Sequence, residues 1–173
     1  MEIESSAFID ADLDTFLAEC RTHEQRDLAE RLEAASARLA ALIGRMAGAD
    51  SNPTEGWSAP EILAHVAGFS KYFGVLAYRV GSGKVADVDL LADIRQRDAV
   101  MQGLMARSPA ELLAAAQASH RQTLDWLRAA RPAALSRRTD VGAGRTLSAE
   151  EILRLGLCAH LEIHLDQLEQ ALT

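Results

Sequence analysis

Residues 57–62, Trp-Ser-Ala-Pro-Glu-Ile, contain a motif typical of the start of a helix. The Ser58 hydroxyl can accept a hydrogen bond from the first turn, and the Glu61 carboxylate can accept one from the backbone of Ser58. Pro60 suits a first turn, where a backbone N–H has no helical partner. Residues 147–152, Leu-Ser-Ala-Glu-Glu-Ile, repeat this arrangement, and residues 108–111, Ser-Pro-Ala-Glu, contain its cap. The three starts predict helices over 58–80, 108–130 and 148–172.

Apolar spacing predicts the remaining helices. A stripe of apolar residues three and four apart predicts the first main helix over 23–47: Leu28, Leu32, Ala35, Leu39, Leu42 and Met46. A short leading helix is expected near 10–20 and an extra helix near 89–106. The long connection that contains the extra helix permits a crossover, so the helices over 58–80 and 108–130 need not be antiparallel neighbours.

The composition agrees with a helical protein. Of the 173 residues 49% are hydrophobic but only 5% are aromatic, and the abundant alanine and leucine lose little conformational freedom in a helix. Sustained runs of alternating β-branched residues, which are typical of strands, are absent. We therefore predict one domain over 1–173, an all-α four-helix bundle with its core at about 23–172. A long crossover between helices two and three and short extra helices complete it.

Charge and hydropathy argue against several classes of protein. The net charge of −7 and the lack of a Lys/Arg cluster disfavour a nucleic-acid binder. No stretch reaches the ~20 apolar residues of a membrane helix, and the N-terminus does not resemble a signal peptide. Cys20 and Cys158 form no CxxC motif, so we expect reduced thiols and a cytoplasmic protein with neither nucleic-acid nor membrane partners.

Three histidines are candidates for a shared site. His160 and His164 are four residues apart in the last predicted helix, so their side chains lie on one face, one turn apart. Both this face and the one that carries His65 are mostly apolar, so all three point inward. At 1.5 Å per residue His65 lies ~10 Å from its helix start, and His160 and His164 lie ~18 and ~24 Å from theirs. The three can therefore meet only if the helices over 58–80 and 148–172 run antiparallel.

Two interpretations fit this pattern. A single inward histidine is usually a hydrogen-bonded core residue, whereas three buried imidazoles without partners would each cost about a few kcal/mol. A metal ion would satisfy all three at once and keep coordination positions open for water or substrate. Spacing alone leaves both interpretations open.

Two motifs resemble the DinB-like family. Residues 57–65, Trp-Ser-x-x-Glu-Ile-Leu-Ala-His, are similar to its second-helix pattern, and residues 159–167, Ala-His-x-x-x-His-x-x-Gln, to its fourth-helix pattern. The resemblance implies a four-helix bundle with a crossover, antiparallel second and fourth helices, and a divalent metal held by His65, His160 and His164. Leu161 and Ile163 stand where many relatives carry acidic or histidine residues, so the surroundings of the ligands are expected to differ.

Other side chains are candidates for supporting roles. His120, on an inward face of the helix over 108–130, is either a fourth ligand or proton shuttle, or a packed core histidine. Gln167 either hydrogen-bonds a ligand or substrate, or only lines the site. Three residues of the last loop either bind an anionic substrate at a pocket mouth or are solvated charges: Arg137, Arg138 and Arg145.

Three functions are compatible with these residues. The first is a divalent-metal-dependent enzyme acting on small molecules, since an ion held by three neutral histidines can activate water or a thiol. Zinc and nickel are favoured, although histidine ligands also suit copper and iron. The resemblance implies hydrolysis, or transfer of a low-molecular-weight thiol cosubstrate such as bacillithiol or mycothiol, and a homodimer. The alternatives are a non-catalytic, metal-stabilised stress-response or binding module, and a metal-free regulatory or dimeric protein.

Overall fold

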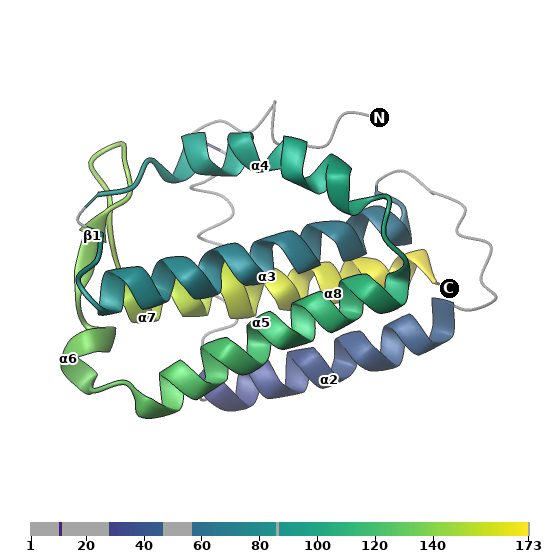
Figure 1. Ribbon diagram of the computed structural model, residues 1–173, viewed down its shortest axis with the longest axis horizontal. Helices are drawn as coiled ribbons and strands as arrows, with labels where there is room; N and C mark the ends of the chain where they lie inside the picture. The colour runs from purple at the N-terminus through teal and green to yellow at the C-terminus, as the bar shows by residue number, and fades with distance from the viewer. Residues whose placement is uncertain (1–10, 12–27, 47–56, 86, 173) are drawn as a thin grey trace.

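The computed structural model describes residue 11 and residues 28–46, 57–85 and 87–172. Its long helices are α2 (Leu28–Met46), α3 (Ala59–Gly81) and α5 (Pro109–Ala129). A fourth helical rod, at the C-terminal end, consists of α7 (Ala149–Glu151), the π-helix η2 (Ile152–Ala159) and α8 (His160–Ala171). Apart from residue 11, which is helical, the predicted leading helix near 10–20 lies outside the described ranges, as do residues 23–27 and 47 of the predicted first main helix. Four long rods confirm the predicted bundle (Figure 1).

The three predicted helix starts are confirmed at the level of single hydrogen bonds. The backbone N–H of Ser58 donates to the Glu61 carboxylate at 2.7 Å, and that of Ser148 donates to Glu151 at 2.7 Å. Ser108 and Glu111 form the same reciprocal cap at the start of α5. Each cap fixes where its helix begins, and therefore the depth of every side chain along it.

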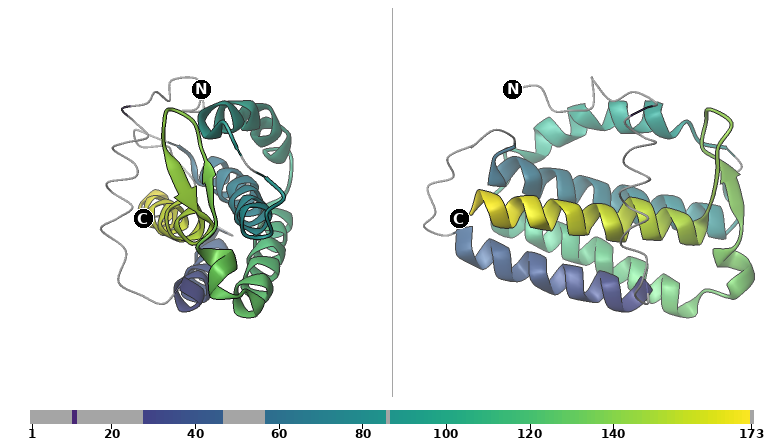
Figure 2. Two further views of the ribbon diagram at one scale, coloured as in Figure 1. Left: turned by 90° about the vertical axis from the view of Figure 1, so that its left-hand side faces the viewer. Right: turned by 180° about the vertical axis from the view of Figure 1, so that it is seen from behind.

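Side-chain contacts give the directions of the helices. Contacts between α2 and α8 advance together, so these helices are parallel: Arg31 with Glu162, Arg38 with Asp166, Arg45 with Glu169. Contacts between α3 and α5 also advance together: Ser70 with His120, and Gly81 beside Trp126. α3 and the C-terminal rod are antiparallel, because His65 contacts His160 while Phe73 contacts Gly156. Viewed end-on in Figure 2, the order around the bundle is α2, α5, α3, α8.

The parallel pair α3 and α5 requires the predicted crossover, which α4 (Leu90–Leu104) provides. This helix returns along the outside of α3, as Figure 1 shows. The predicted last loop, residues 131–146, is more ordered than expected. It contains the short helix α6 (Pro132–Leu135) and much of a hairpin of β1 (Arg138–Asp140) and β2 (Thr146–Ser148), whose turn has positive φ at Gly142, Ala143 and Gly144.

The prediction of one uninterrupted helix over 148–172 is corrected by the π-helix in its middle. A π-helix has a wider turn than an α-helix and often lies at a functional site. Its eight residues are buried except Arg154. Gly156 lies against the Phe73 ring so closely that an added Cβ would come within 2.4 Å of it. The glycine thus allows η2 to pack directly onto α3.

None of the helices in the described part of the chain combines the length and the apolarity needed to cross a membrane.

Candidate metal centre

The three predicted histidines meet between α3 and the C-terminal rod. Nε2 of His160 lies 2.9 Å from Nε2 of His65 and 2.9 Å from Nε2 of His164. One ring nitrogen from each histidine lies within 4.8 Å of the other two. The antiparallel packing that the depth of each residue required is therefore present, and it brings together residues 95 positions apart in the sequence.

Hydrogen bonds determine which ring nitrogens carry protons. His164 Nδ1 lies 2.7 Å from Gln167 Oε1, an acceptor, so Nδ1 carries the proton and Nε2 a lone pair. His160 hydrogen-bonds to the backbone of Gly156, an interaction that only partly opposes the lowering of its pKa by burial and by His164. Since His160 Nε2 faces the other histidines, the donor to Gly156 is Nδ1, and Nε2 again has a lone pair. Two lone pairs thus face each other at 2.9 Å, an arrangement that a cation would stabilise.

His65 leaves a second polar group unsatisfied. Its Nδ1 is buried and has no hydrogen-bond partner in the part of the chain that the structure describes. Its Nε2 can donate to His160 Nε2 at most, which would still leave His164 Nε2 facing His160 without a proton between them. Because buried polar groups are normally paired, the donor set of this site fits a metal ion better than a self-contained hydrogen-bond network.

Burial keeps the three imidazoles neutral. His65, His160 and His164 are 9%, 8% and 7% exposed. Desolvation lowers the pKa of His164 to about 4. Desolvation, and then repulsion from the neighbouring histidines, holds the pKa of His65 and of His160 well below the ordinary value. Neutral imidazole is the form that binds metals, so the site is ready to bind one near pH 7.

Aromatic side chains enclose the histidines. Trp57 stacks parallel to His164 with 5.7 Å between ring centroids and meets His65 edge-on at 4.6 Å. Phe69 stacks on His65 at 4.3 Å, and Phe73 meets His160 edge-on at 5.8 Å. The sequence contains a signal for this wall, because Phe69 and Phe73 follow His65 by four and eight residues on one helical face. Phe73 itself is not among the site residues predicted from the sequence.

The other face of α8 is fixed to α2. Arg31, which is 1% exposed, donates to both carboxylate oxygens of Glu162 at 3.0 and 2.7 Å. Glu162 lies between the two histidines in sequence, so this bidentate pair limits rotation of the helix segment that carries them. Cys158 is also buried here, and burial raises the pKa of its thiol to about 12, as expected for a structural rather than a reactive cysteine.

His120 is placed apart from the three histidines. Its Nδ1 lies 3.0 Å from Ser36 Oγ and its Nε2 2.9 Å from Ser70 Oγ, so both ring nitrogens already have partners. These bonds join α5 to α2 and α3. The contacts are those of the packed core histidine that the sequence left as one alternative.

The three loop arginines lie at the opposite end of the bundle. Arg137 donates to the carbonyl of Gly81 at 2.8 Å, and Gly81 is about 24 Å along α3 from His65 at 1.5 Å per residue. Arg138 binds Thr146 and Glu151, and Arg145 belongs to the hairpin turn. The structure therefore does not bring these arginines to the histidines, and their contacts support the hairpin.

Comparison with known proteins identifies the family of the chain. No curated protein and no solved structure shows significant similarity to the chain. The family model described as the DinB superfamily matches residues 22–168, which include the three histidines and the four rods up to residue 168 of the last one. The chain therefore belongs to the DinB superfamily.

Proposed function

We propose that His65, His160 and His164 are the ligands of a divalent metal ion, zinc or nickel, in an enzyme that acts on small molecules. The observation that carries the proposal is the 2.9 Å separation of Nε2 of His160 and Nε2 of His164, to which the hydrogen bonds of the two Nδ1 atoms assign facing lone pairs. The third nitrogen, from His65, completes a set of the kind found in zinc sites that keep an open position.

A divalent ion bound here would act as a Lewis acid and lower the pKa of a water or thiol that binds to it. The chain's own residues prepare the site. Gln167 holds the proton of His164 on Nδ1, which keeps Nε2 available. Trp57 and Phe69 pack against the imidazoles and limit the access of water. The cluster contains no carboxylate in the described part of the chain, so the full charge of the ion would be available to an anionic ligand.

The reaction that we propose is hydrolysis of a small molecule or transfer of a low-molecular-weight thiol. Both need a nucleophile made by loss of a proton, and both need an open coordination position. Membership of the DinB superfamily supports the metal site. Both reactions are compatible with the chemistry of the site, and the substrate screen below distinguishes them.

Metal analysis of untagged protein tests the metal site. We expect about one zinc or nickel per chain, and loss of this metal in a His160→Ala/His164→Ala variant. A Gln122→Ala variant, which changes an exposed side chain of α5, should keep it. Substoichiometric metal together with no uptake of added zinc or nickel would contradict the proposal.

A substrate screen then separates the enzyme from a metal-stabilised module. The metal-loaded protein is assayed for hydrolysis and for thiol transfer, with the double histidine variant as the blank. Turnover by the wild type alone supports the enzyme. Full metal occupancy and a large drop in melting temperature in the variant, without turnover on any substrate of the screen, would favour a structural metal instead.

A further inference from the structure

We infer that the cavity between α3, α4 and α5 is a second binding site, for an aliphatic carboxylate. The cavity has a volume of about 590 Å³, which is within the range of small-molecule sites. Its described lining includes none of the three histidines, although Gly68, Tyr72 and Leu76 share the face of α3 that carries His65. It is therefore a site distinct from the proposed metal centre.

The crossover helix creates this cavity. α4 packs mainly against α3, and it comes very close at Gly68, where an added Cβ would lie 2.8 Å from Met101 Sδ. Since α4 does not pack on α5 in the same way, a space remains between them. Its walls are largely apolar and include Leu76, Leu104 and Ala118. Such walls suit a hydrocarbon chain.

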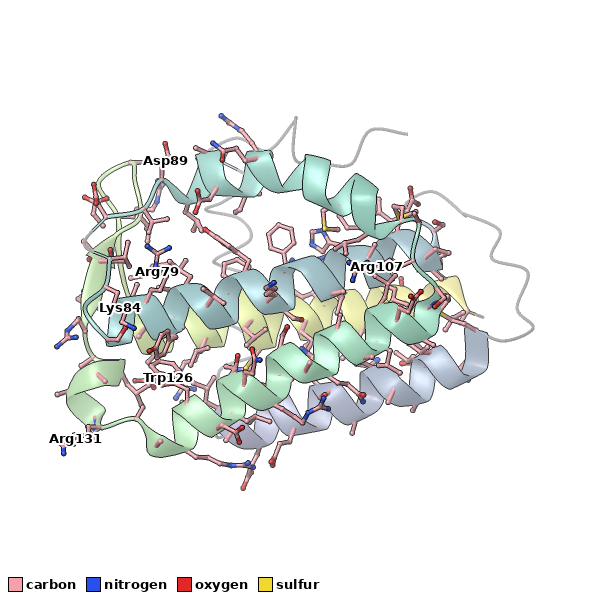
Figure 3. All side chains as sticks on the ribbon, viewed as in Figure 1. Arg79, Lys84, Asp89, Arg107, Trp126 and Arg131 are labelled. Carbon is pink, nitrogen blue, oxygen red and sulfur yellow. The ribbon has the colours of Figure 1, made fainter. Side chains whose placement is uncertain are left out.

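Cations surround the apolar walls. Lys71, Arg79 and Arg107 are exposed and line the cavity, and Figure 3 shows Arg79 and Arg107 toward its two ends. Lys71 and Arg79 have no carboxylate partner within the described ranges, and Arg107 lies near the capping carboxylate of Glu111.

Among the side chains that the structure describes, one acidic group lines the cavity, and it already has a hydrogen-bond partner. Asp93 accepts a hydrogen bond from the Tyr72 hydroxyl at 2.9 Å. The described lining residues therefore carry three positive charges and one negative charge. By contrast, Arg38 in α2, outside the cavity, is paired with Asp166 and Glu169. An apolar interior with a cationic rim is complementary to a molecule with a hydrocarbon body and an anionic head.

Isothermal titration with decanoate tests the inference, with 1-decanol as a neutral ligand of the same chain length. We expect saturable one-to-one binding of decanoate and clearly weaker binding of decanol. A Lys71→Gln/Arg79→Gln variant should bind decanoate roughly tenfold more weakly, because it removes two favourable charge interactions. The matched control is Arg121→Gln/Arg131→Gln, which makes the same change in net charge at exposed sites outside the cavity and should leave the affinity within about twofold.

Two further variants locate the ligand. Ala118→Phe should abolish binding by filling the cavity, with circular dichroism and melting temperature as checks of folding. The His160→Ala/His164→Ala variant should bind decanoate as the wild type does, and loss of binding there would place the carboxylate at the histidines and overturn the inference. Equal affinity for decanol, no saturable binding, or an unchanged affinity in Lys71→Gln/Arg79→Gln would also overturn it.

Discussion

Replacing Gly156 with alanine should destabilise the protein, although alanine is the better helix former. The new methyl carbon would lie 2.4, 2.5 and 2.8 Å from three atoms of the Phe73 ring. These are far inside van der Waals contact, and Phe73 is itself buried, so neither group can move away freely. Overpacking of this kind costs about 1–3 kcal/mol, against a gain of about 0.5–1 kcal/mol from helix propensity. We expect a net loss of about 1–2 kcal/mol from the free energy of unfolding.

Gly44→Ala is the matched control, because no atom lies within 4 Å of its added Cβ. Gly44 is exposed within α2, so this variant should gain up to about 1 kcal/mol. Urea unfolding gives both values, and a Phe73→Leu/Gly156→Ala double-mutant cycle isolates the contact, with an expected favourable coupling of about 1 kcal/mol. A Gly156→Ala variant as stable as Gly44→Ala, or a cycle without coupling, would refute the close packing of η2 on α3.

Three further predictions concern polar groups. Gln167→Leu should weaken metal binding about 10–100-fold by removing the acceptor of His164 Nδ1, whereas Gln167→Glu keeps an acceptor and should keep the affinity. Competition with a chromophoric chelator measures the affinity of each variant. A leucine variant that binds metal as tightly as the wild type would exclude the orienting role of Gln167. Burial lowers the pKa of His120 to about 4 from an ordinary 6.5, so the unfolded chain binds the extra proton first, and stability present above pH 6.5 is lost as the pH falls toward 4. Between pH 7 and pH 5 the free energy of unfolding should fall by about 2 kcal/mol more than in a His120→Gln variant. Urea unfolding of both proteins across this pH range measures the difference, and the same pH dependence in both would disprove the prediction. Arg31→Met should cost about 2–4 kcal/mol because it leaves the partly buried Glu162 carboxylate without its bidentate partner, and Arg31→Met/Glu162→Leu should recover part of that loss in the same assay.

The fold could be predicted from the sequence where local chemistry decides it. Each capping pair, such as Ser58 with Glu61, encodes a helix start within four residues, and the structure confirms all three starts. The convergence of the histidines could also be predicted, because helix rise converts sequence position into depth. Predicting that His65 meets His160 required only the assumption that their helices run antiparallel.

The remaining features depend on contacts that no local pattern contains. The π-helix has the same apolar composition as an α-helix, and Gly156 within it packs on Phe73, a residue 83 positions away. The hairpin has strands of three mostly polar residues, too short for an alternating pattern to show. The hairpin also decides where Arg137 lies, since its guanidinium binds the end of α3 rather than the site.

The crossover has a consequence for the kinetics of folding. The parallel helices α3 and α5 are joined through α4, and the histidines of α3 and α8 are 95 residues apart, so the cluster exists only after the last helix docks. Contacts of such long sequence separation slow folding relative to a simple up-and-down bundle. A ligand that needs all three histidines would then bind after the rate-limiting step, so adding metal during refolding should leave the folding rate unchanged and slow unfolding alone.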